Sequence, residues 1–252
     1  MDDILSDQEL LRYNRQIVIR AFDIDGQEAL KQAHALIIGA GGLGCAAAQY
    51  LVTAGIGQIT LVDFDHVELS NLQRQVLHRD ARINMNKAES AAIELRQLNP
   101  HVRIDVIDRR LEEAELAQQV GRHQIVLDCT DNVTTRDLLN RCCFASKTPL
   151  ISAAAIRMEG LVTVLDYGDD KPCYQCFSAM FGDQQLSCVE SGILAPVVGM
   201  VGCLQATEAV KQLSGMGKTL SGRILMIDAM TMEFREMKLP KRPNCPVCGS
   251  QG

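Results

Sequence analysis

The sequence has no excess of basic residues. Its 25 lysine and arginine residues are outnumbered by 31 aspartate and glutamate residues, which gives a net charge of −6. Nucleic acids and anionic membrane surfaces attract basic proteins, so we expect neither a nucleic-acid nor a membrane partner. An anionic ligand must therefore be held by a local cluster of polar and cationic groups.

Signals for export and for membrane insertion are also lacking. Residues 1–16 have neither the basic flank nor the apolar run of a secretion signal, which predicts a cytoplasmic protein. The uncharged stretch from Ala35 to Val62 resembles a membrane span, but glycines interrupt it at positions 39, 41, 42, 44, 55 and 57. A buried strand, turn and helix is the better interpretation. The five histidines show no spacing typical of metal ligands, so we assign them no role.

Short apolar runs alternate with helical patterns through the first 160 residues. This alternation predicts an α/β fold with a Rossmann-like, mostly parallel sheet. After residue 160 the spacing of strands suggests an antiparallel half, with one long helix at 193–213, a long loop at 168–191, and Met226, Met230 and Met232 packing the sheet. The predicted strands are Ala35–Ile38, Ile59–Val62, Val102–Val106, Ile125–Leu127, Pro149–Ala155, Leu161–Tyr167, Arg223–Asp228 and Phe234–Leu239.

A glycine-rich turn follows the first predicted strand. Gly39, Gly41 and Gly44 match the pattern G-x-G-x-x-G between a strand and a helix, where backbone amides can face a phosphate. Asp63 follows at the distance expected of a carboxylate that binds ribose hydroxyls. The turn predicts a nucleotide site but does not identify the nucleotide, because most such turns bind NAD or FAD.

Charged residues near the glycine-rich turn indicate a binding site for a nucleoside triphosphate. Arg74 lies in the string SNLQRQ and Lys87 opens the next helix, so both could clamp phosphates, although either could be a solvated surface cation. Asp131, in DCTDN, could hold Mg2+ or could cap the helix that follows. Together these residues favour a site that consumes ATP over one that transfers hydride.

These motifs, with RYNRQ at residues 12–16 and two CxxC pairs, resemble the ubiquitin-activating-like adenylyltransferases (the HesA/MoeB/ThiF family). The resemblance runs nearly end to end and is stronger to the molybdopterin-synthase (MoeB-type) branch than to the thiamine (ThiF) branch, notably in LSDQELLRYNRQI, AAIRMEG and SCVESGILAP. It implies one adenylation domain over 1–252, with a nucleotide-binding half at about 1–160 and an antiparallel half at about 161–252 that carries the carrier-binding loop and zinc tail.

The resemblance also implies a reaction and a set of roles. Family members use ATP to adenylylate the C-terminal Gly-Gly carboxylate of a MoaD-like, ubiquitin-fold sulphur carrier, releasing pyrophosphate. Arg15 would reach into the partner's site in a homodimer that binds two carriers, and a separate protein would donate sulphur. The residues expected at ATP are Gly39, Gly41, Gly42, Gly44, Asp63, Ser70, Asn71, Arg74, Lys87, Asp131 (with Mg2+) and Asn132.

Ten cysteines in a reducing compartment favour metal or thiol chemistry over disulfides. The pairs Cys173/Cys176 and Cys245/Cys248 favour zinc over a redox dithiol, because the Pro-rich tail has little else to hold it, and the resemblance implies the same four-cysteine, structural zinc site. Cys188, in SCVES, is a candidate nucleophile, although a passive or sulphur-relay thiol is the favoured interpretation. Core positions are expected for the remaining cysteines, Cys45, Cys129, Cys142, Cys143 and Cys203.

Two alternatives stay open at this point. The same chemistry could serve a thiamine-pathway sulphur carrier. The chain could instead be a nucleotide-binding scaffold or an NAD-dependent oxidoreductase, which would need neither the SNLQRQ clamp nor the combination of Arg74, Lys87 and Asp131.

Overall fold

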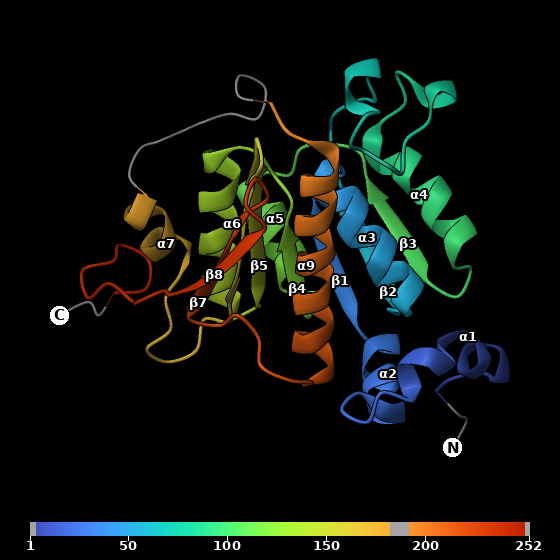
Figure 1. Cartoon of the computed structure of the whole chain (residues 1–252), viewed down its shortest axis with the longest axis horizontal. Helices are drawn as coiled ribbons and strands as arrows, with labels where there is room; N and C mark the ends of the chain where they lie inside the picture. Colours follow the sequence, from blue (N-terminus) through green and yellow to red (C-terminus); the bar gives the residue numbers. More distant parts are fainter. Residues whose placement is uncertain (1–3, 182–191, 250–252) are drawn as a thin grey trace.

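The structure is a computed structural model of the chain, and it describes residues 4–181 and 192–249. One eight-stranded sheet, in the order β3-β2-β1-β4-β5-β6-β7-β8, forms its centre. The strands from β3 to β5 in that order run parallel, whereas β5 to β8 pair antiparallel. The predicted change from a parallel to an antiparallel sheet is confirmed, and a single sheet runs through both halves (Figure 1).

The order of the parallel strands, β3-β2-β1-β4-β5, is the one found in many nucleotide-binding sheets. β1 and β4 are neighbours in space, although β2 and β3 lie between them in the chain. At such a switch point the helices that follow the two strands leave toward opposite faces, and a crevice opens at the carboxyl ends. The parallel strands are β1 (His34–Ile38), β2 (Gln58–Val62), β3 (Arg103–Ile107), β4 (Ile125–Asp128) and β5 (Leu150–Ile156).

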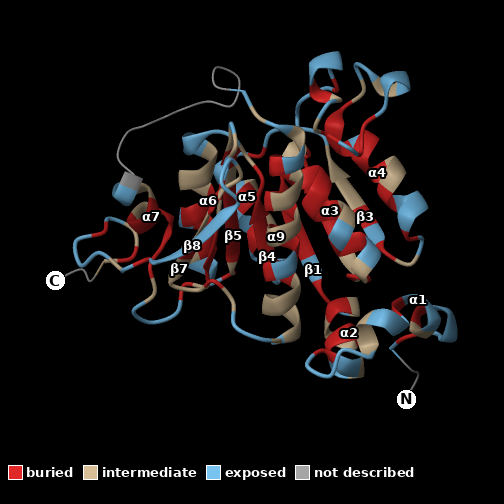
Figure 2. Ribbon diagram, in the orientation of Figure 1, coloured by how far each residue is buried: buried red, intermediate tan, exposed pale blue. Residues whose placement is uncertain are grey.

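Helices cover both faces of the sheet, which buries β1, β2 and β4 almost completely (Figure 2). Burial on both faces explains why these strands are continuous apolar runs. One face carries α3 (Gly42–Ala54), α4 (Lys87–Leu98) and α9 (Ala195–Ser214), and the other carries α5 (Glu113–Val120) and α6 (Val133–Ser146). Two short 3-10 turns, Leu69–Asn71 and Asp80–Arg82, lie between β2 and α4.

Four helices lie where the apolar pattern predicted none. α1 (Asp7–Ile17) and α2 (Asp23–Lys31) lie at the amino ends of the parallel strands, α5 precedes β4, and α7 (Tyr174–Phe181) interrupts the predicted loop at 168–191 (Figure 1). α1 begins with a capping box formed by Ser6 and Glu9, and α5 has one formed by Glu112 and Glu115. These helices are only 8 to 11 residues long, so each has too few apolar positions for their spacing to predict it.

The antiparallel half ends in an exposed strand. β6 (Glu159–Leu165) and β7 (Arg223–Asp228) continue the sheet, and β8 (Glu233–Lys238) lies at its edge with all six residues exposed. Met226 packs against the core, but Met230 and Met232 are 74% and 65% exposed, so their predicted packing is wrong. They lie in the turn between β7 and β8, outside the sheet that was expected to cover them.

Among the described residues, no helix combines the length and the apolar character needed to cross a membrane.

Candidate nucleotide site and four-cysteine cluster

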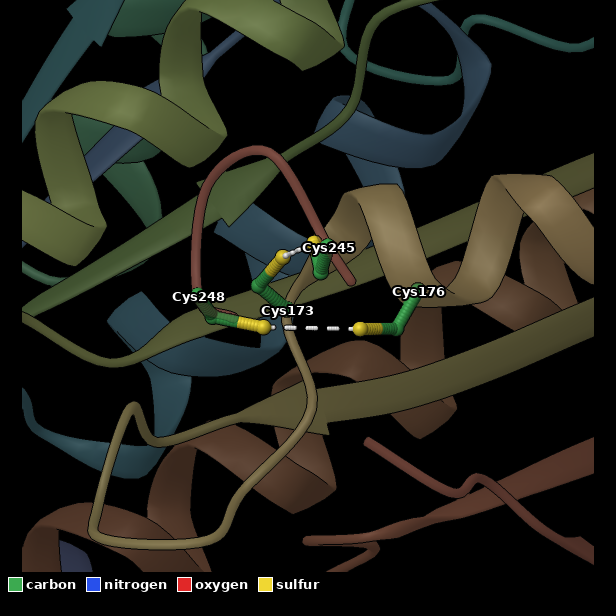
Figure 3. Close-up of side chains that lie close together, drawn as sticks. All are labelled: Cys173, Cys176, Cys245 and Cys248. Carbon is green, nitrogen blue, oxygen red and sulfur yellow. Dashed lines mark hydrogen bonds between the residues drawn. The ribbon is translucent and has the colours of Figure 1, made fainter. Parts of the chain in front are cut away.

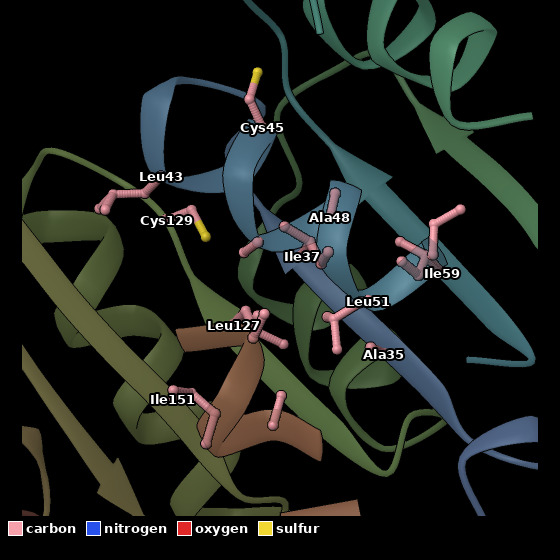
Figure 4. Close-up of a cluster of buried hydrophobic side chains, with 14 of the residues drawn as sticks. Ala35, Ile37, Leu43, Cys45, Ala48, Leu51, Ile59, Leu127, Cys129 and Ile151 are labelled. Carbon is pink, nitrogen blue, oxygen red and sulfur yellow. The ribbon is translucent and has the colours of Figure 1, made fainter. Parts of the chain in front are cut away.

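The glycine turn joins β1 to α3 at the switch point. Gly39 adopts a φ of 99°, which favours glycine, and a Cβ there would lie 2.7 Å from the carbonyl oxygen of Cys129 at the end of β4. A Cβ on Gly44 would lie 1.9 Å from the carbonyl oxygen of Gly39. These two glycines therefore allow the close approach of strand, turn and helix, over the packed core that Figure 4 shows.

The start of α3 has backbone amides that no side chain caps. Gly41 is the N-cap residue, and the first helical hydrogen bond runs from the Cys45 amide to the Gly41 carbonyl. A Cβ on Gly41 would meet only the Gln75 side chain, at an ordinary 3.7 Å. The uncapped amides and the helix dipole make this end of α3 suitable for a phosphate.

Asp63 holds the turn from the end of β2. Its Oδ2 accepts a hydrogen bond from the Ala40 amide at 2.7 Å, and its Oδ1 accepts one from the Asp65 amide at 2.8 Å. Burial raises the pKa of Asp63, although both amides act against that shift. Asp63 thus orients the turn, in addition to the ribose contact that the sequence predicts for it.

Arg74 lies beside the turn without an acidic partner. Its Cγ is 3.6 Å from the position that a Cβ on Gly42 would occupy, and its Nη1 donates to the carbonyl of Ser70 at 3.0 Å. Within the described residues it forms no salt bridge. Its positive charge is therefore not neutralised locally, as a phosphate clamp requires.

The other predicted clamps already have partners. The Lys87 side chain is 11% exposed, and its Nζ forms a salt bridge of 3.0 Å with Asp65. Asn71 is buried, and its Oδ1 accepts the amide of Glu68 at 3.2 Å, while Ser70 donates to Glu68. Lys87 would have to share or leave Asp65 to contact a phosphate, and Asn71 shapes its own turn.

Asp131 and Asn132 follow β4 and have different roles in the structure. Asn132 is the N-cap of α6, and its Oδ1 accepts the amide of Thr135 at 2.8 Å. Asp131 is exposed and, among the described contacts, has no hydrogen-bond or salt-bridge partner. Because Asn132 is the cap, the alternative interpretation of Asp131 as the capping residue is wrong. The free carboxylate is a suitable ligand for Mg2+.

Arg15 lies far from the turn of its own chain. It is exposed on α1, and its neighbour Gln16 donates to the carbonyl of Ala54 at the carboxyl end of α3, at 2.9 Å. The glycine turn is at the other end of this 13-residue helix, about 20 Å away. The structure therefore does not bring Arg15 to the site within one chain.

Two buried residues that the sequence did not single out support the site. His78 Nε2 lies 3.0 Å from the Ala40 carbonyl, so this nitrogen donates, and His78 Nδ1 lies 3.0 Å from the Ser90 hydroxyl. Burial lowers the pKa of His78, which favours its neutral form. Asn86 donates to the carbonyls of Asp63, Asp65 and Asp108 and caps α4. Both residues resemble ordinary surface polar residues in sequence, and only the fold brings them under the site.

The two CxxC pairs form one cluster (Figure 3). The sulfur atoms of Cys173, Cys176, Cys245 and Cys248 all lie within 4.8 Å of one another, and all four residues are buried. Cys173 and Cys245 are 3.5 Å apart, and Cys176 and Cys248 are 3.4 Å apart. Tetrahedral zinc with Zn–S bonds of about 2.3 Å needs sulfurs about 3.8 Å apart, so the four thiols fit zinc.

The backbone around Cys245 and Cys248 forms a tight turn that directs both thiols toward one point. A Cβ on Gly249 would lie 2.5 Å from the carbonyl oxygens of both Cys245 and Pro243, so the tight turn needs glycine there. Burial raises the pKa of Cys245, but hydrogen bonds from the amides of Cys248 and Val247 outweigh it, and the net effect lowers the pKa to about 7. These amides favour the thiolate of Cys245, the form that binds a metal ion, whereas burial raises the pKa of Cys173 and Cys248.

We expect Cys248→Ser to lower zinc content and thermal stability together. Removing one of four ligands weakens the cross-link between the tail and α7, so the melting temperature should fall by roughly 5 °C. Atomic absorption and calorimetry measure the two effects. Cys203→Ser, which changes a half-buried thiol outside the cluster, is the control. Full zinc retention in Cys248→Ser would contradict a four-cysteine site.

The remaining cysteines divide into two groups. Cys45, Cys129, Cys142 and Cys143 are buried, as expected, and Cys203 is only partly buried. Burial raises the pKa of Cys45 to about 12, so this thiol is protonated at neutral pH. Cys188 lies outside the described residues, and its suggested thiol role stays a prediction.

Comparisons with known proteins agree on one family. Residues 13–247 match the ThiF family. The chain is 59% identical over 245 residues to the molybdopterin-synthase adenylyltransferase of Escherichia coli strain K12, covering 97% of this chain and 98% of that protein. It is 45% identical to the adenylyltransferase and sulfurtransferase MOCS3 of Drosophila virilis, covering 98% of this chain and 55% of that protein. The crystal structure of E. coli MccB with ATP superposes with a TM-score of 0.84 at 24% identity, over 99% of this chain and 77% of MccB, a likeness of fold.

Proposed function

Because the chain belongs to the ThiF family, we propose that it is an adenylyltransferase that transfers AMP from ATP to the C-terminal Gly-Gly carboxylate of a small ubiquitin-fold protein. The acceptor is the MoaD-like small subunit of molybdopterin synthase, which is activated for thiocarboxylate formation in molybdenum cofactor synthesis. The name and 59% identity of the E. coli relative support this choice of substrate.

One observation carries the chemistry of the proposal. At the carboxyl ends of β1 and β4, the uncapped amides of α3 lie beside Arg74, which has no acidic partner in the described part of the chain. Asp131, also without a described partner, follows β4 two residues after Cys129, whose carbonyl contacts the glycine turn. Unneutralised donors and a free carboxylate at one edge suit a nucleotide triphosphate with its metal ion.

The reaction needs alignment more than acid-base catalysis. An oxygen of the carrier's carboxylate attacks the α-phosphorus of ATP, the bond from that phosphorus to the bridging oxygen breaks, and pyrophosphate leaves. An ionised carboxylate needs no general base, so the chain's task is to orient the phosphates and to neutralise their charge. The α3 amides and Arg74 supply this, and Lys87 contributes when it is shared with Asp65. Magnesium bound at Asp131 would add positive charge at the phosphates.

Exchange of labelled pyrophosphate into ATP tests this proposal. The purified protein is mixed with ATP, Mg2+ and, in turn, the molybdopterin-synthase small subunit and the thiamine sulphur carrier. We expect exchange with the first carrier only. Exchange with the thiamine carrier alone would assign the same chemistry to the other pathway, and no exchange with either carrier would leave a nucleotide-binding scaffold.

We further propose a homodimer in which Arg15 completes the partner's site. Arg15 is exposed and about one helix length from its own turn, and it lies on α1 near exposed apolar residues. Leu11 is 77%, Val18 is 67% and Ile19 is 50% exposed, an apolar surface of the kind that symmetric interfaces bury. With one carrier at each site the assembly would hold two carriers, and a separate protein would donate sulphur.

Mixing two inactive variants tests the shared site. Arg15→Ala and Asp131→Ala should each be inactive alone. After dissociation and random reassociation, half of the dimers are mixed, and each mixed dimer has one site with both residues, so activity should recover to about a quarter of wild type. Pyrophosphate exchange measures the recovery. Two samples of the same variant, mixed in the same way, are the control, and no recovery in the mixed sample would place Arg15 outside the partner's site.

A further inference from the structure

The four-cysteine cluster and the loop that carries Asp131 are connected through buried polar contacts. Tyr174 lies between Cys173 and Cys176 and begins α7, and it is 4% exposed. Its amide donates to Asn140 Oδ1 on α6 at 2.9 Å, and the next residue, Gln175, donates to Asp137 on α6 at 2.5 Å. The segment between Cys173 and Cys176 is therefore hydrogen-bonded to α6, the helix that begins directly after Asp131 and Asn132.

The side chain of Tyr174 reaches one residue of α6 in particular. Its phenolic oxygen lies beside the guanidinium of Arg136, whose positive charge opposes the rise that burial causes in the pKa of Tyr174. Arg136 is largely buried, and its Nη2 donates to the carbonyl of Thr130 at 2.6 Å and to the carbonyl of Ala153 at 3.2 Å. Arg136 Nη2 thus holds Thr130, the residue immediately before Asp131. The Tyr174 hydroxyl lies beside the same guanidinium.

The charge of Arg136 is balanced at the base of the same loop. Asp128, at the end of β4, is fully buried, and its Oδ2 lies 3.6 Å from Arg136 Nε. Asp128 Oδ1 accepts from both the amide and the hydroxyl of Thr130, at 3.1 and 2.7 Å. Ser152 donates to the other carboxylate oxygen. Thr130 is held on one side by Asp128 and on the other by Arg136, which fixes where the chain turns outward to Asp131.

We propose that Tyr174 and Arg136 form a positioning relay by which the four-cysteine cluster sets the conformation of the Asp131 loop. The cluster then acts on the nucleotide site as well as on the C-terminal tail. Tyr174 and Arg136 are positioning residues, because neither is placed in contact with the nucleotide. The consequence for nucleotide binding rests on the proposed function, whereas the consequence for the loop does not.

Hydrogen–deuterium exchange of the zinc-loaded protein tests the relay without any substrate. The amides of Thr130 and Thr135 are bonded to Asp128 and Asn132, so a peptide covering 128–135 reports the order of the loop. Tyr174→Phe removes only the phenolic oxygen. We expect exchange in this peptide to be roughly fivefold faster, the scale of coupling through a packed network, with zinc content unchanged.

Tyr167→Phe is the matched control. Tyr167 is also a buried tyrosine near the cluster, and its hydroxyl donates to Asn140 Oδ1, which also accepts the amide of Tyr174, but no described contact joins it to Arg136. Its loss should leave exchange at 128–135 unchanged. Equal acceleration in the two variants, or none in Tyr174→Phe, would overturn the relay.

Removing zinc provides a second test of the relay by the same exchange measurement. Chelation should accelerate exchange at 128–135 in the wild-type protein and add little in Tyr174→Phe, because the relay is already cut. An equal effect of chelation in both proteins would overturn the relay as the route. In parallel, calorimetric titration with ATP and Mg2+ should show roughly fivefold weaker binding to Tyr174→Phe. If the wild-type protein binds no ATP, the proposed function fails, and the exchange measurements still decide the relay.

Discussion

Asp131→Ala should lower the rate of adenylate formation about a hundredfold, the loss seen when one preorganised electrostatic contact to a reacting group is removed, about 3 kcal/mol. Asp131 is the carboxylate at the switch point that is exposed and has no partner among the described contacts. The guanidinium of Arg136 attracts this negative charge without forming a salt bridge with it, and a bound cation would stabilise the charge further. Pyrophosphate exchange with the carrier present measures the rate, and Asp131→Asn should be equally inactive because an amide binds Mg2+ poorly.

The free energy of unfolding of Asp131→Ala shows whether the variant loses activity because a metal ligand is missing or because the protein is unfolded. Because Asp131 is exposed and forms no hydrogen bond or salt bridge among the described residues, its replacement should change the free energy of unfolding by about 0.5 kcal/mol at most. Asp25→Ala, an exposed acid on α2 at the opposite end of the sheet, is a control of equal charge and should keep full activity. Near-normal turnover of Asp131→Ala would remove Asp131 from the site.

Arg136→Met should destabilise the fold by about 3–5 kcal/mol, the cost of leaving a buried charge without its partner. Asp128 is fully buried beside Arg136, and the carbonyls of Thr130 and Ala153 would also lose a donor. Denaturant unfolding followed by circular dichroism measures the change. Asp128→Asn combined with Arg136→Met should regain part of the loss, because the unpaired charge is then absent.

A second arginine on the same helix is the control for this effect. Arg141 is about half exposed, and it pairs with Glu113, which is 64% exposed, at 3.6 Å. A solvated pair of this kind contributes little, so Arg141→Met should cost less than about 1 kcal/mol. A similar loss in both variants would mean that the helix, and not the buried pair with Asp128, is sensitive to substitution.

The glycine turn and the sheet could be predicted from sequence because they depend on local, repeating constraints. Gly39 and Gly44 are needed wherever a strand, a tight turn and a helix meet, and buried strands must be apolar along their whole length. Each CxxC pair indicates by its own spacing that two thiols face one ion, whereas the joining of both pairs in one site is only suggested by the sequence and is strengthened by the family resemblance; the structure brings the pairs together.

Contacts between distant segments could not be predicted in this way. His78 supports Ala40 across 38 residues, and Asn86 binds three loop carbonyls, but neither residue type differs in sequence from a solvated one. The pairing of Lys87 with Asp65 depends on how the loop after β2 folds back on α4. Arg15 lies away from the glycine turn of its own chain, so the role that the sequence predicts for it in a partner's site stays a proposal.

The exposed strand β8 has a consequence for how the purified protein behaves in solution. No strand of the described part of the chain pairs with its outer edge, and Phe234 and Met237 on this strand are 48% and 41% exposed. Four of its six residues, Glu233, Arg235, Glu236 and Lys238, are charged, and charges on an edge strand oppose pairing with a second sheet. At 1 M salt, where charges are screened beyond about 3 Å, this protection is largely lost. Colloidal stability should therefore fall as salt rises, and concentrated stocks keep best at low ionic strength.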